Sequence, residues 1–172
     1  MSTLFVNNLN TASGSTITVP TGKQLIVTDQ GGMRVPGSVI QVVNSINTTH
    51  ASSNTASWAA TDVAATITPK YNTSKVLVQF TGAIRVYNSS GGNASGAWRI
   101  YRSVGGASFA QVGTHQMTHR FYDYGNSGII ADQPFHMQYL DSPSTTSAVI
   151  YKLYWYKEDG TCLLYTSDAA DE

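Results

Sequence analysis

Hydrophobic and polar residues alternate with a period of two along much of this chain, which is typical of half-buried β-strands. Residues 75–87 place Val76, Val78, Phe80, Ile84 and Val86 on one face and Leu77, Gln79, Thr81, Ala83, Arg85 and Tyr87 on the other. Residues 147–156 place Val149, Tyr151, Leu153 and Trp155 on one face. No segment sustains the apolar spacing of an amphipathic helix, so the sequence predicts an all-β fold.

Shorter segments with alternating or β-branched residues predict further strands. They are residues 17–19, 24–28, 39–46, 97–102, 109–112, 115–121 and 135–140. Within residues 97–102, Trp98 and Ile100 are expected to face away from Arg99 and Tyr101. Gly82 indicates a bulge in the strand over residues 75–87.

Turn residues separate these strands. The sequence predicts turns at Pro20-Thr21-Gly22, at Asp132-Gln133-Pro134 and at Asp141-Ser142-Pro143. Glu158-Asp159-Gly160 predicts a hairpin with a returning strand. Many strands joined by such turns favour an antiparallel, jelly-roll-like β-sandwich.

The pattern changes near Pro36. Residues 1–36 contain short strands with too little apolar mass for a core of their own, so they predict a β-rich stalk that winds with identical chains. Residues 37–161 predict the sandwich head. The sequence thus indicates one domain preceded by an oligomerisation segment.

Composition narrows the functional classes. Charged residues make up only 12%, well below the average of about 25% for globular domains. There is no lysine or arginine cluster for nucleic acid, and no apolar run of about 18 residues for membrane insertion. The N-terminus lacks the basic and apolar regions of a signal peptide.

Residues 162–172 depart abruptly from the composition before them and resemble a translated sequencing adapter, with all eleven positions in agreement. The alternative is a natural C-terminal strand with an acidic tail. On the adapter interpretation the only cysteine, Cys162, is foreign, so disulfide, zinc-thiolate and cysteine-nucleophile hypotheses no longer apply. Ten basic and seven acidic residues then remain, a net charge of about +3. We expect the natural protein to continue past Thr161.

Several short motifs, in a fixed order, touch most of residues 4–161. They are Leu4-Phe5-Val6-Asn7, Val19 to Lys23, Gly32 to Gln41, Ile67-Thr68-Pro69, Ser74 to Val78 and Leu140 to Ser147. In these motifs the chain resembles the C-terminal domains of tail-fibre and other virion structural proteins of marine phages, such as cyanophages and pelagiphages.

This resemblance implies a non-enzymatic homotrimer with a sandwich head on a β-rich stalk, without a cofactor. It would assemble in the host cytoplasm and be displayed on the phage tail. Its expected partners are other tail proteins and a glycan or protein receptor on the host surface. The family's usual final strands are missing here, because residues 162–172 stand in their place.

Candidate contact residues come from the aromatic clusters. Exposed Tyr and Trp rings can stack on sugars, while Asn, Asp and Arg supply hydrogen bonds. The candidates for ligand or receptor contact are Trp98, Tyr101, Tyr122, Asp123, Tyr124 and Asn126. About half of such rings are expected to fill the core instead.

Two other groups of residues could carry chemistry. His115 and His119 lie on one face and are weak metal candidates, because no third fixed ligand accompanies them. Asp132 and Asp141 would be the carboxylate pair of a polysaccharide depolymerase, but each also suits a turn. The main alternative to the virion hypothesis is a carbohydrate-binding β-sandwich module of a secreted protein.

Overall fold

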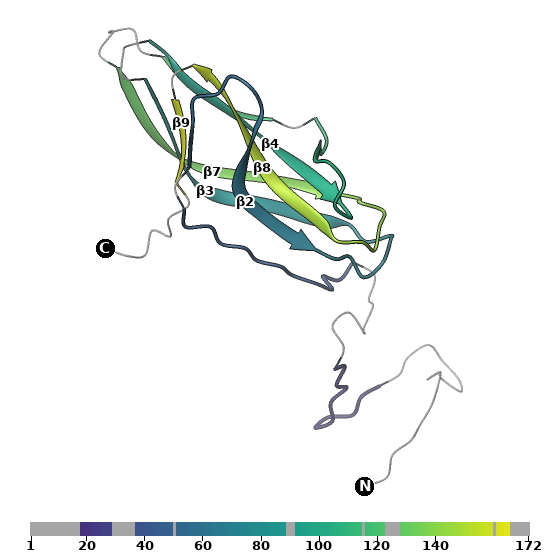
Figure 1. Ribbon diagram of the computed structural model, residues 1–172. Coiled ribbons are helices and arrows are strands. Elements are labelled where there is room, and N and C mark those ends of the chain that lie inside the picture. The colour runs from purple at the N-terminus through teal and green to yellow at the C-terminus, as the bar shows by residue number, and fades with distance from the viewer. Residues whose placement is uncertain are drawn as a thin grey trace. The chain divides into compact units, whose positions relative to one another are not determined.

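A computed structural model of the chain describes residues 18–28, 37–49, 51–88, 92–114, 116–122, 128–159 and 161–165. These ranges contain strands and no helix (Figure 1), which confirms the predicted all-β class. Within them, no helix has the length and apolar character needed to span a membrane. The chain divides into two compact units, Met1–Val42 and Val43–Glu172, and every described strand lies in the second.

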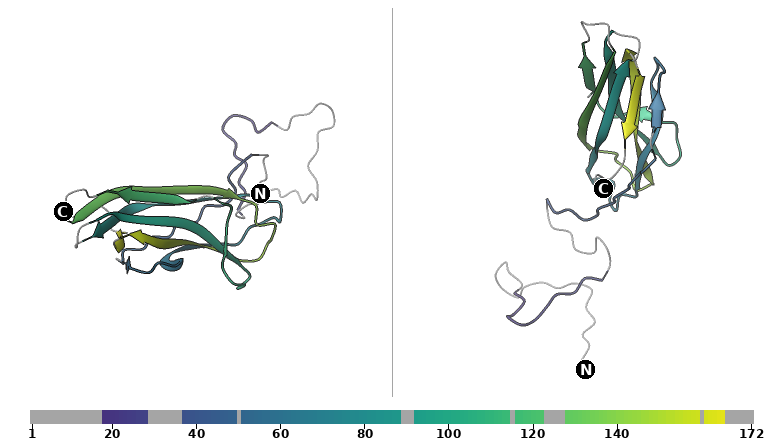
Figure 2. Two further views of the ribbon diagram at one scale, coloured as in Figure 1. Left: turned by 90° about the horizontal axis from the view of Figure 1, so that it is seen from above. Right: turned by 90° about the vertical axis from the view of Figure 1, so that its left-hand side faces the viewer.

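The second unit consists of two antiparallel sheets that pack as a sandwich (Figure 2). The strands are β1 (Ala51–Ser53), β2 (Ala59–Ile67), β3 (Val76–Asn88), β4 (Ala94–Val104), β5 (Ala110–Gln111), β6 (Met117–Phe121), β7 (Ile129–Asp141), β8 (Val149–Asp159) and β9 (Thr161–Tyr165). One sheet has the order β1-β9-β3-β7. The other has the order β2-β8-β4-β5, and β6 also pairs with β4. The predicted antiparallel sandwich is therefore confirmed.

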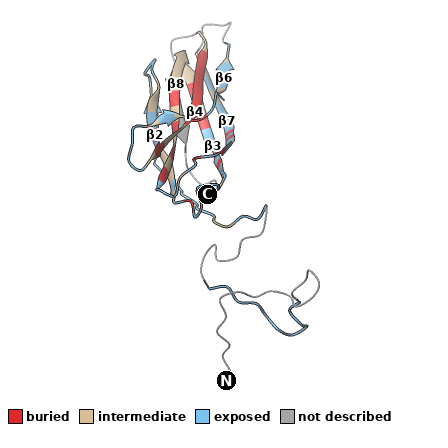
Figure 3. Cartoon of the chain, turned by 90° about the vertical axis from the view of Figure 1, so that its right-hand side faces the viewer, coloured by how far each residue is buried: buried red, intermediate tan, exposed pale blue. Residues whose placement is uncertain are grey.

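The core forms where the inner faces of the two sheets meet (Figure 3). β3 contributes Val78, Phe80, Ile84 and Val86, β4 contributes Trp98 and Ile100, β7 contributes Phe135 and Met137, and β8 contributes Val149, Tyr151, Leu153 and Trp155. The rings of Trp98 and Phe135 lie 5.7 Å apart and join the two sheets. The faces predicted for β3, β4 and β8 are thus confirmed, since burial follows the alternation.

β7 is much longer than predicted. Asp132, Gln133 and Pro134 are not a turn, because they pair with Arg85, Ile84 and Ala83 of β3 within the strand. Proline has no backbone N–H to donate. It therefore disrupts a central strand, which bonds to a neighbour on each side, but it is tolerated in an edge strand. β7 ends its sheet, so the missing donor of Pro134 costs no ladder bond on the open side.

The bulge predicted at Gly82 is not observed. The β3–β7 register runs unbroken through Gly82, so no bulge occurs there in that pairing. Register shifts occur instead in β4, between Ser95 and Gly96, and in β2, between Ala60 and Ala64. There the buried hydroxyl of Thr61 donates to the carbonyl of Leu153 at 2.8 Å, which satisfies a polar group inside the sandwich.

The segment after Glu158 does not return beside β8 as a hairpin. β9 instead joins the opposite sheet, where its backbone pairs with β1 on one side and β3 on the other. The predicted hairpin is wrong, because the chain changes sheets at this point. β9 covers the first residues of the 162–172 segment, and its backbone occupies a central position in the four-stranded sheet.

Two predicted strands, and the described residues 18 and 19 of the strand predicted over residues 17–19, are not strands in the structure. Residues 24–28 and 39–46 contain β-branched side chains but form no ladder. The turn at Pro20-Thr21-Gly22 is present, with the amide of Lys23 donating to the carbonyl of Pro20 at 3.0 Å and Gly22 at φ 79°. A strand pattern forms a ladder only beside a neighbouring strand, and no described residue of this chain pairs with these segments.

Candidate functional site

The outer face of the five-stranded sheet carries aromatic rings around an arginine. Residues that alternate with the buried positions of β4 and β8 point outward, and flanking segments add two more rings. We call this set the arginine–aromatic platform: Trp58, Arg99, Tyr101, Phe109, Tyr154 and Tyr156. All six are half-buried, so each side chain packs on the sheet and keeps part of its surface in solvent.

The rings of the platform contact one another in two groups. Tyr101 and Tyr154 stack across the β4–β8 ladder with centroids 3.9 Å apart, and Phe109 lies 6.1 Å from Tyr154. Trp58 lies 5.4 Å from Tyr156. Rings that support one another in this way lose little entropy when a ligand packs on them.

Arg99 lies between these groups and is held in place by neutral side chains. Its guanidinium carbon is 4.2 Å from the centroid of the Trp58 ring. Nε and Nη2 donate to the amide oxygen of Gln116 at 2.9 and 2.6 Å, and Nη1 donates to that of Gln111 at 2.9 Å. The cation is therefore fixed without being neutralised.

The other described arginines behave differently. Arg85 pairs with Asp132, Arg102 with Asp141 and Arg120 with Glu158. Arg99 makes no such ion pair with any described residue. The pKa of Arg120 is raised because Glu158 bonds to its guanidinium, and Arg85 lowers the pKa of Asp132 by the same effect. A guanidinium held only by amides has no carboxylate beside it to offset its charge.

Asp141 has a role that the sequence analysis missed. It is buried at the end of β7, where its carboxylate accepts two bonds from Nη1 of Arg102, at 2.6 and 2.7 Å. The hydroxyl of Tyr151 donates to the same carboxylate at 2.7 Å. Burial and the neighbouring carboxylate raise the pKa of Tyr151. Asp141 therefore joins the two sheets, which its expected role as a turn former does not describe.

Asp132 and Asp141 do not form a carboxylate pair. They lie nine residues apart on one extended strand, a separation of about 30 Å. Asp132 is exposed and Asp141 buried, so their side chains also point to opposite faces of β7. Paired glycosidase carboxylates lie roughly 5–10 Å apart. These two residues cannot share a scissile bond.

The predicted contact residues have different fates. Tyr122 is 54% exposed, just after β6, and Tyr101 belongs to the platform. Trp98 is fully buried in the core, so its predicted surface contact does not fit this structure. Asp123, Tyr124 and Asn126 lie outside the described residues. Trp58 and Arg99 were not predicted as contact residues, although the expected placement of Arg99 and Tyr101 on one face was a usable signal.

The histidine pair is described only in part, because His115 lies outside the described residues. His119 is half-buried, and its ring meets that of Trp98 edge-on at 5.3 Å. Its Nε2 is buried and has no hydrogen-bond partner among the described residues. Burial lowers the pKa of His119. Among the residues that the structure describes, no group of three or more His, Cys, Asp or Glu side chains could hold a metal ion.

His119 should make stability fall in mild acid. Its pKa is near 6.5 in the unfolded chain and lower in the folded one, so the unfolded state takes up the proton first. Its contribution is therefore complete above about pH 6.5 and declines as the pH falls toward the lowered folded value. We expect His119→Gln to remove this part of the pH dependence, measured as the unfolding midpoint from pH 8 to pH 5.

His136→Gln is the matched control, since His136 lies exposed on β7. As an exposed substitution it should change the unfolding midpoint at pH 8 only slightly. An unaltered slope in His119→Gln would contradict the assignment.

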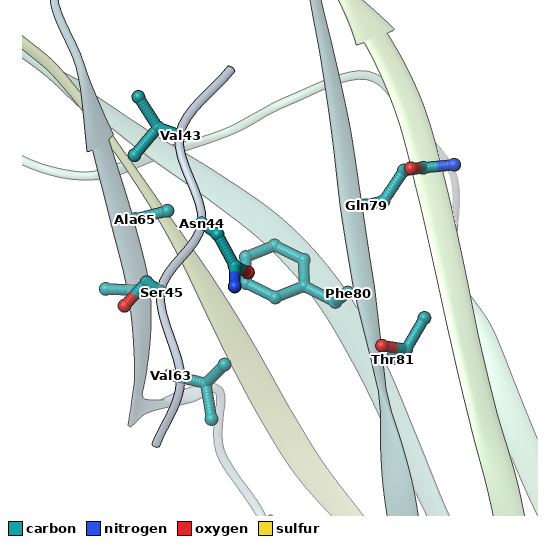
Figure 4. Close-up of a pocket in the computed structure, with 9 residues that line it drawn as sticks. Val43, Asn44, Ser45, Val63, Ala65, Gln79, Phe80 and Thr81 are labelled. Atoms are coloured by element: carbon teal, nitrogen blue, oxygen red, sulfur yellow. The ribbon is translucent and has the colours of Figure 1, made fainter.

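A small hollow lies between residues 43–45, β2 and β3, with a volume of about 130 Å³ (Figure 4). Its lining consists of Val43, Asn44, Ser45, Val63, Ala64, Ala65, Gln79, Phe80 and Thr81. None of these side chains ionises near neutral pH. Ligand pockets usually measure about 300–1,000 Å³, so the hollow is too small for a sugar and has no acid or base.

The fold thus defines the chain as an antiparallel β-sandwich protein without helices in its described part. No protein family, curated protein or solved structure matches it.

Proposed function

We propose that this chain is a non-enzymatic structural and adhesion module of a phage virion, similar to a tail fibre, with a jelly-roll head. The observation that carries the proposal is the strand order of the sandwich, β1-β9-β3-β7 against β2-β8-β4-β5. Jelly rolls are recurrent in viral structural and lectin domains. Fold alone does not determine function, so the proposal also depends on the surfaces of the two units.

The chain order of the strands supports the jelly-roll assignment. A jelly roll places eight strands, connected as two Greek keys, in two four-stranded sheets. Here the chain changes sheets at each step from β1 to β4, remains in one sheet through β5 and β6, and then changes again for β7, β8 and β9. If the short β5 and β6 are counted as one interrupted strand, this order of sheets supports a jelly-roll topology.

The N-terminal unit supports association with identical chains. Its described residues form no strand, yet Leu25 is 67% exposed, Ile26 74% and Val39 81%. Consecutive β-branched and apolar residues left in water are unfavourable, and pairing with other copies would cover them. This supports a homotrimeric stalk on a virion, with the head free to contact a host receptor.

Light scattering of the full chain tests this arrangement. We expect a trimer, and we expect Leu25→Ser with Ile26→Ser to shift it toward smaller species, because the change removes two exposed apolar side chains from the stalk. The control is Leu77→Ser with Leu140→Ser, an exposed cross-strand pair on the head, which should leave the trimer intact. A folded, monodisperse monomer would refute the stalk assignment.

A carbohydrate-binding sandwich of a secreted protein is the second candidate. The arginine–aromatic platform favours it, because half-exposed rings beside hydrogen-bonding side chains suit sugar recognition. A glycan array with the monomeric fraction separates the two. Specific binding by a monomer favours the secreted module, whereas binding only by an assembled trimer favours the virion protein.

A further inference from the structure

We propose that the arginine–aromatic platform binds an acidic saccharide, with Arg99 holding a carboxylate or sulfate of the sugar. This inference deepens the proposed function, since it names the receptor chemistry that an adhesion module of this kind would recognise. The inference depends on a contrast among the described arginines of the sandwich. Arg99 is bonded to neutral amides, whereas the other three are paired with carboxylates.

Arg99 retains the capacity to bind an anion. A guanidinium has five N–H donors, and the bonds to Gln111 and Gln116 use three, which leaves two. Planar donors on Arg match the oxygens of a carboxylate or sulfate and recognise them with defined geometry. The amides and the Trp58 ring already fix the side chain, so binding would cost little further rotamer entropy.

The surroundings of Arg99 suit a sugar in particular. The Trp58 ring, which contacts Tyr156, packs on the Arg99 guanidinium. Tyr154 is the cross-strand neighbour of Arg99 on β8, and its ring stacks on that of Tyr101. Half-exposed aromatic rings offer apolar faces to the C–H surfaces of a pyranose, while the cation selects the acidic group. An isolated inorganic anion would not use the rings.

A second cation strengthens the charge complementarity. Lys152 pairs with Tyr101 across β4 and β8, and its Nζ lies 5.4 Å from the Phe109 ring. Like Arg99, it forms no ion pair with any described residue. Two cations on one face, each beside aromatic rings, favour a ligand with repeated negative charges. An acidic oligosaccharide meets this condition and a neutral one does not.

The test is titration of the full chain with three oligosaccharide probes. These are oligogalacturonate for carboxylates, chondroitin sulfate fragments for sulfates, and neutral galacto-oligosaccharides of similar length. We expect at least one acidic probe to bind about tenfold or more tightly than the neutral one, and its affinity to fall with added salt. The acidic probe that binds identifies the anionic group. Equal binding of all three probes, or no binding, would overturn the proposal.

Matched arginine variants locate the site. Arg99→Gln should weaken binding of the acidic probe about tenfold or more, while Arg85→Gln removes the same charge from the other sheet and should leave affinity unchanged. Arg99→Lys preserves the charge but not the planar donors, so an intermediate loss is expected. Trp58→Ala should weaken both kinds of probe, the acidic one more, because the Trp58 ring also holds Arg99. Equal losses for Arg85→Gln and Arg99→Gln would mean diffuse charge attraction and would refute the site.

Two controls keep the outcomes separable. Near-ultraviolet circular dichroism checks that each variant is folded. If Arg99→Gln does not fold, the loss of binding in Arg99→Lys tests the site instead. Light scattering on the same samples reports on the proposed function independently. A trimer that binds no acidic probe would refute the platform and leave the virion module standing. A monomer with Arg99-dependent binding would support the platform and count against the virion module.

Discussion

Replacing Trp98 with alanine should destabilise the sandwich by about 3–5 kcal/mol. The side chain is fully buried, and its ring packs against Phe135 of the opposite sheet. Truncation removes the largest side chain of this contact and leaves a cavity that two rigid sheets cannot close. Folded domains are stable by only about 5–15 kcal/mol, so the variant should be at or near unfolding at 37 °C. Chemical denaturation followed by far-ultraviolet circular dichroism measures the change.

Leu77→Ala is the control for this experiment. Leu77 belongs to the outer face of β3 and is 57% exposed, so its truncation should change stability by no more than about 0.5 kcal/mol. A fluorescence readout is also possible, because Trp58 and Trp155 remain in the variant. If Trp98→Ala kept the stability of the wild type, Trp98 would be a surface residue and the orientation of β4 would be wrong.

The sequence predicts the strands that bury one face and expose the other, because their apolar and polar residues alternate strictly. β3 and β8 bury alternate residues and expose the others, so their inner faces follow directly from the chain. β2 was missed because its alanines and threonines give little apolar contrast. β7 was cut short because proline usually ends a strand, and only knowledge of the strand order shows that β7 is an edge.

The candidate site could be predicted only in part, since its chemistry depends on contacts distant in the chain. Alternation places Arg99 and Tyr101 on one face, and this holds in the structure. Arg99 bonds to Gln116, whereas Arg102 bonds to the carboxylate of Asp141. This difference depends on how β4 packs against other parts of the chain, which the local sequence does not reveal. The sequence around Asp141 resembles a turn, so its buried role could not be predicted. That role depends on Arg102 and Tyr151, which lie on the facing sheet.

Removing Asp141 should be almost as costly as truncating the core. Asp141→Ala leaves the guanidinium of Arg102 and the buried hydroxyl of Tyr151 without their shared acceptor. Breaking a buried ion pair costs about 3–5 kcal/mol, and we expect about 3 kcal/mol here because the Arg102 side chain is 32% exposed while that of Asp141 is 7% exposed. Tyr151→Phe, which removes one bond only, should cost about 1 kcal/mol. Thermal and denaturant unfolding measure both.

Asp132→Ala is the matched control, because it breaks an ion pair on the same strand that lies in solvent. Exposed pairs contribute about 0–1 kcal/mol, so this change should be small. A double variant, Arg102→Met with Asp141→Leu, should cost less than the two single changes together, since no buried charge is left unpaired. Additive costs would contradict this account, because they would mean that Arg102 and Asp141 stabilise the sandwich independently and not as a bridge between its sheets.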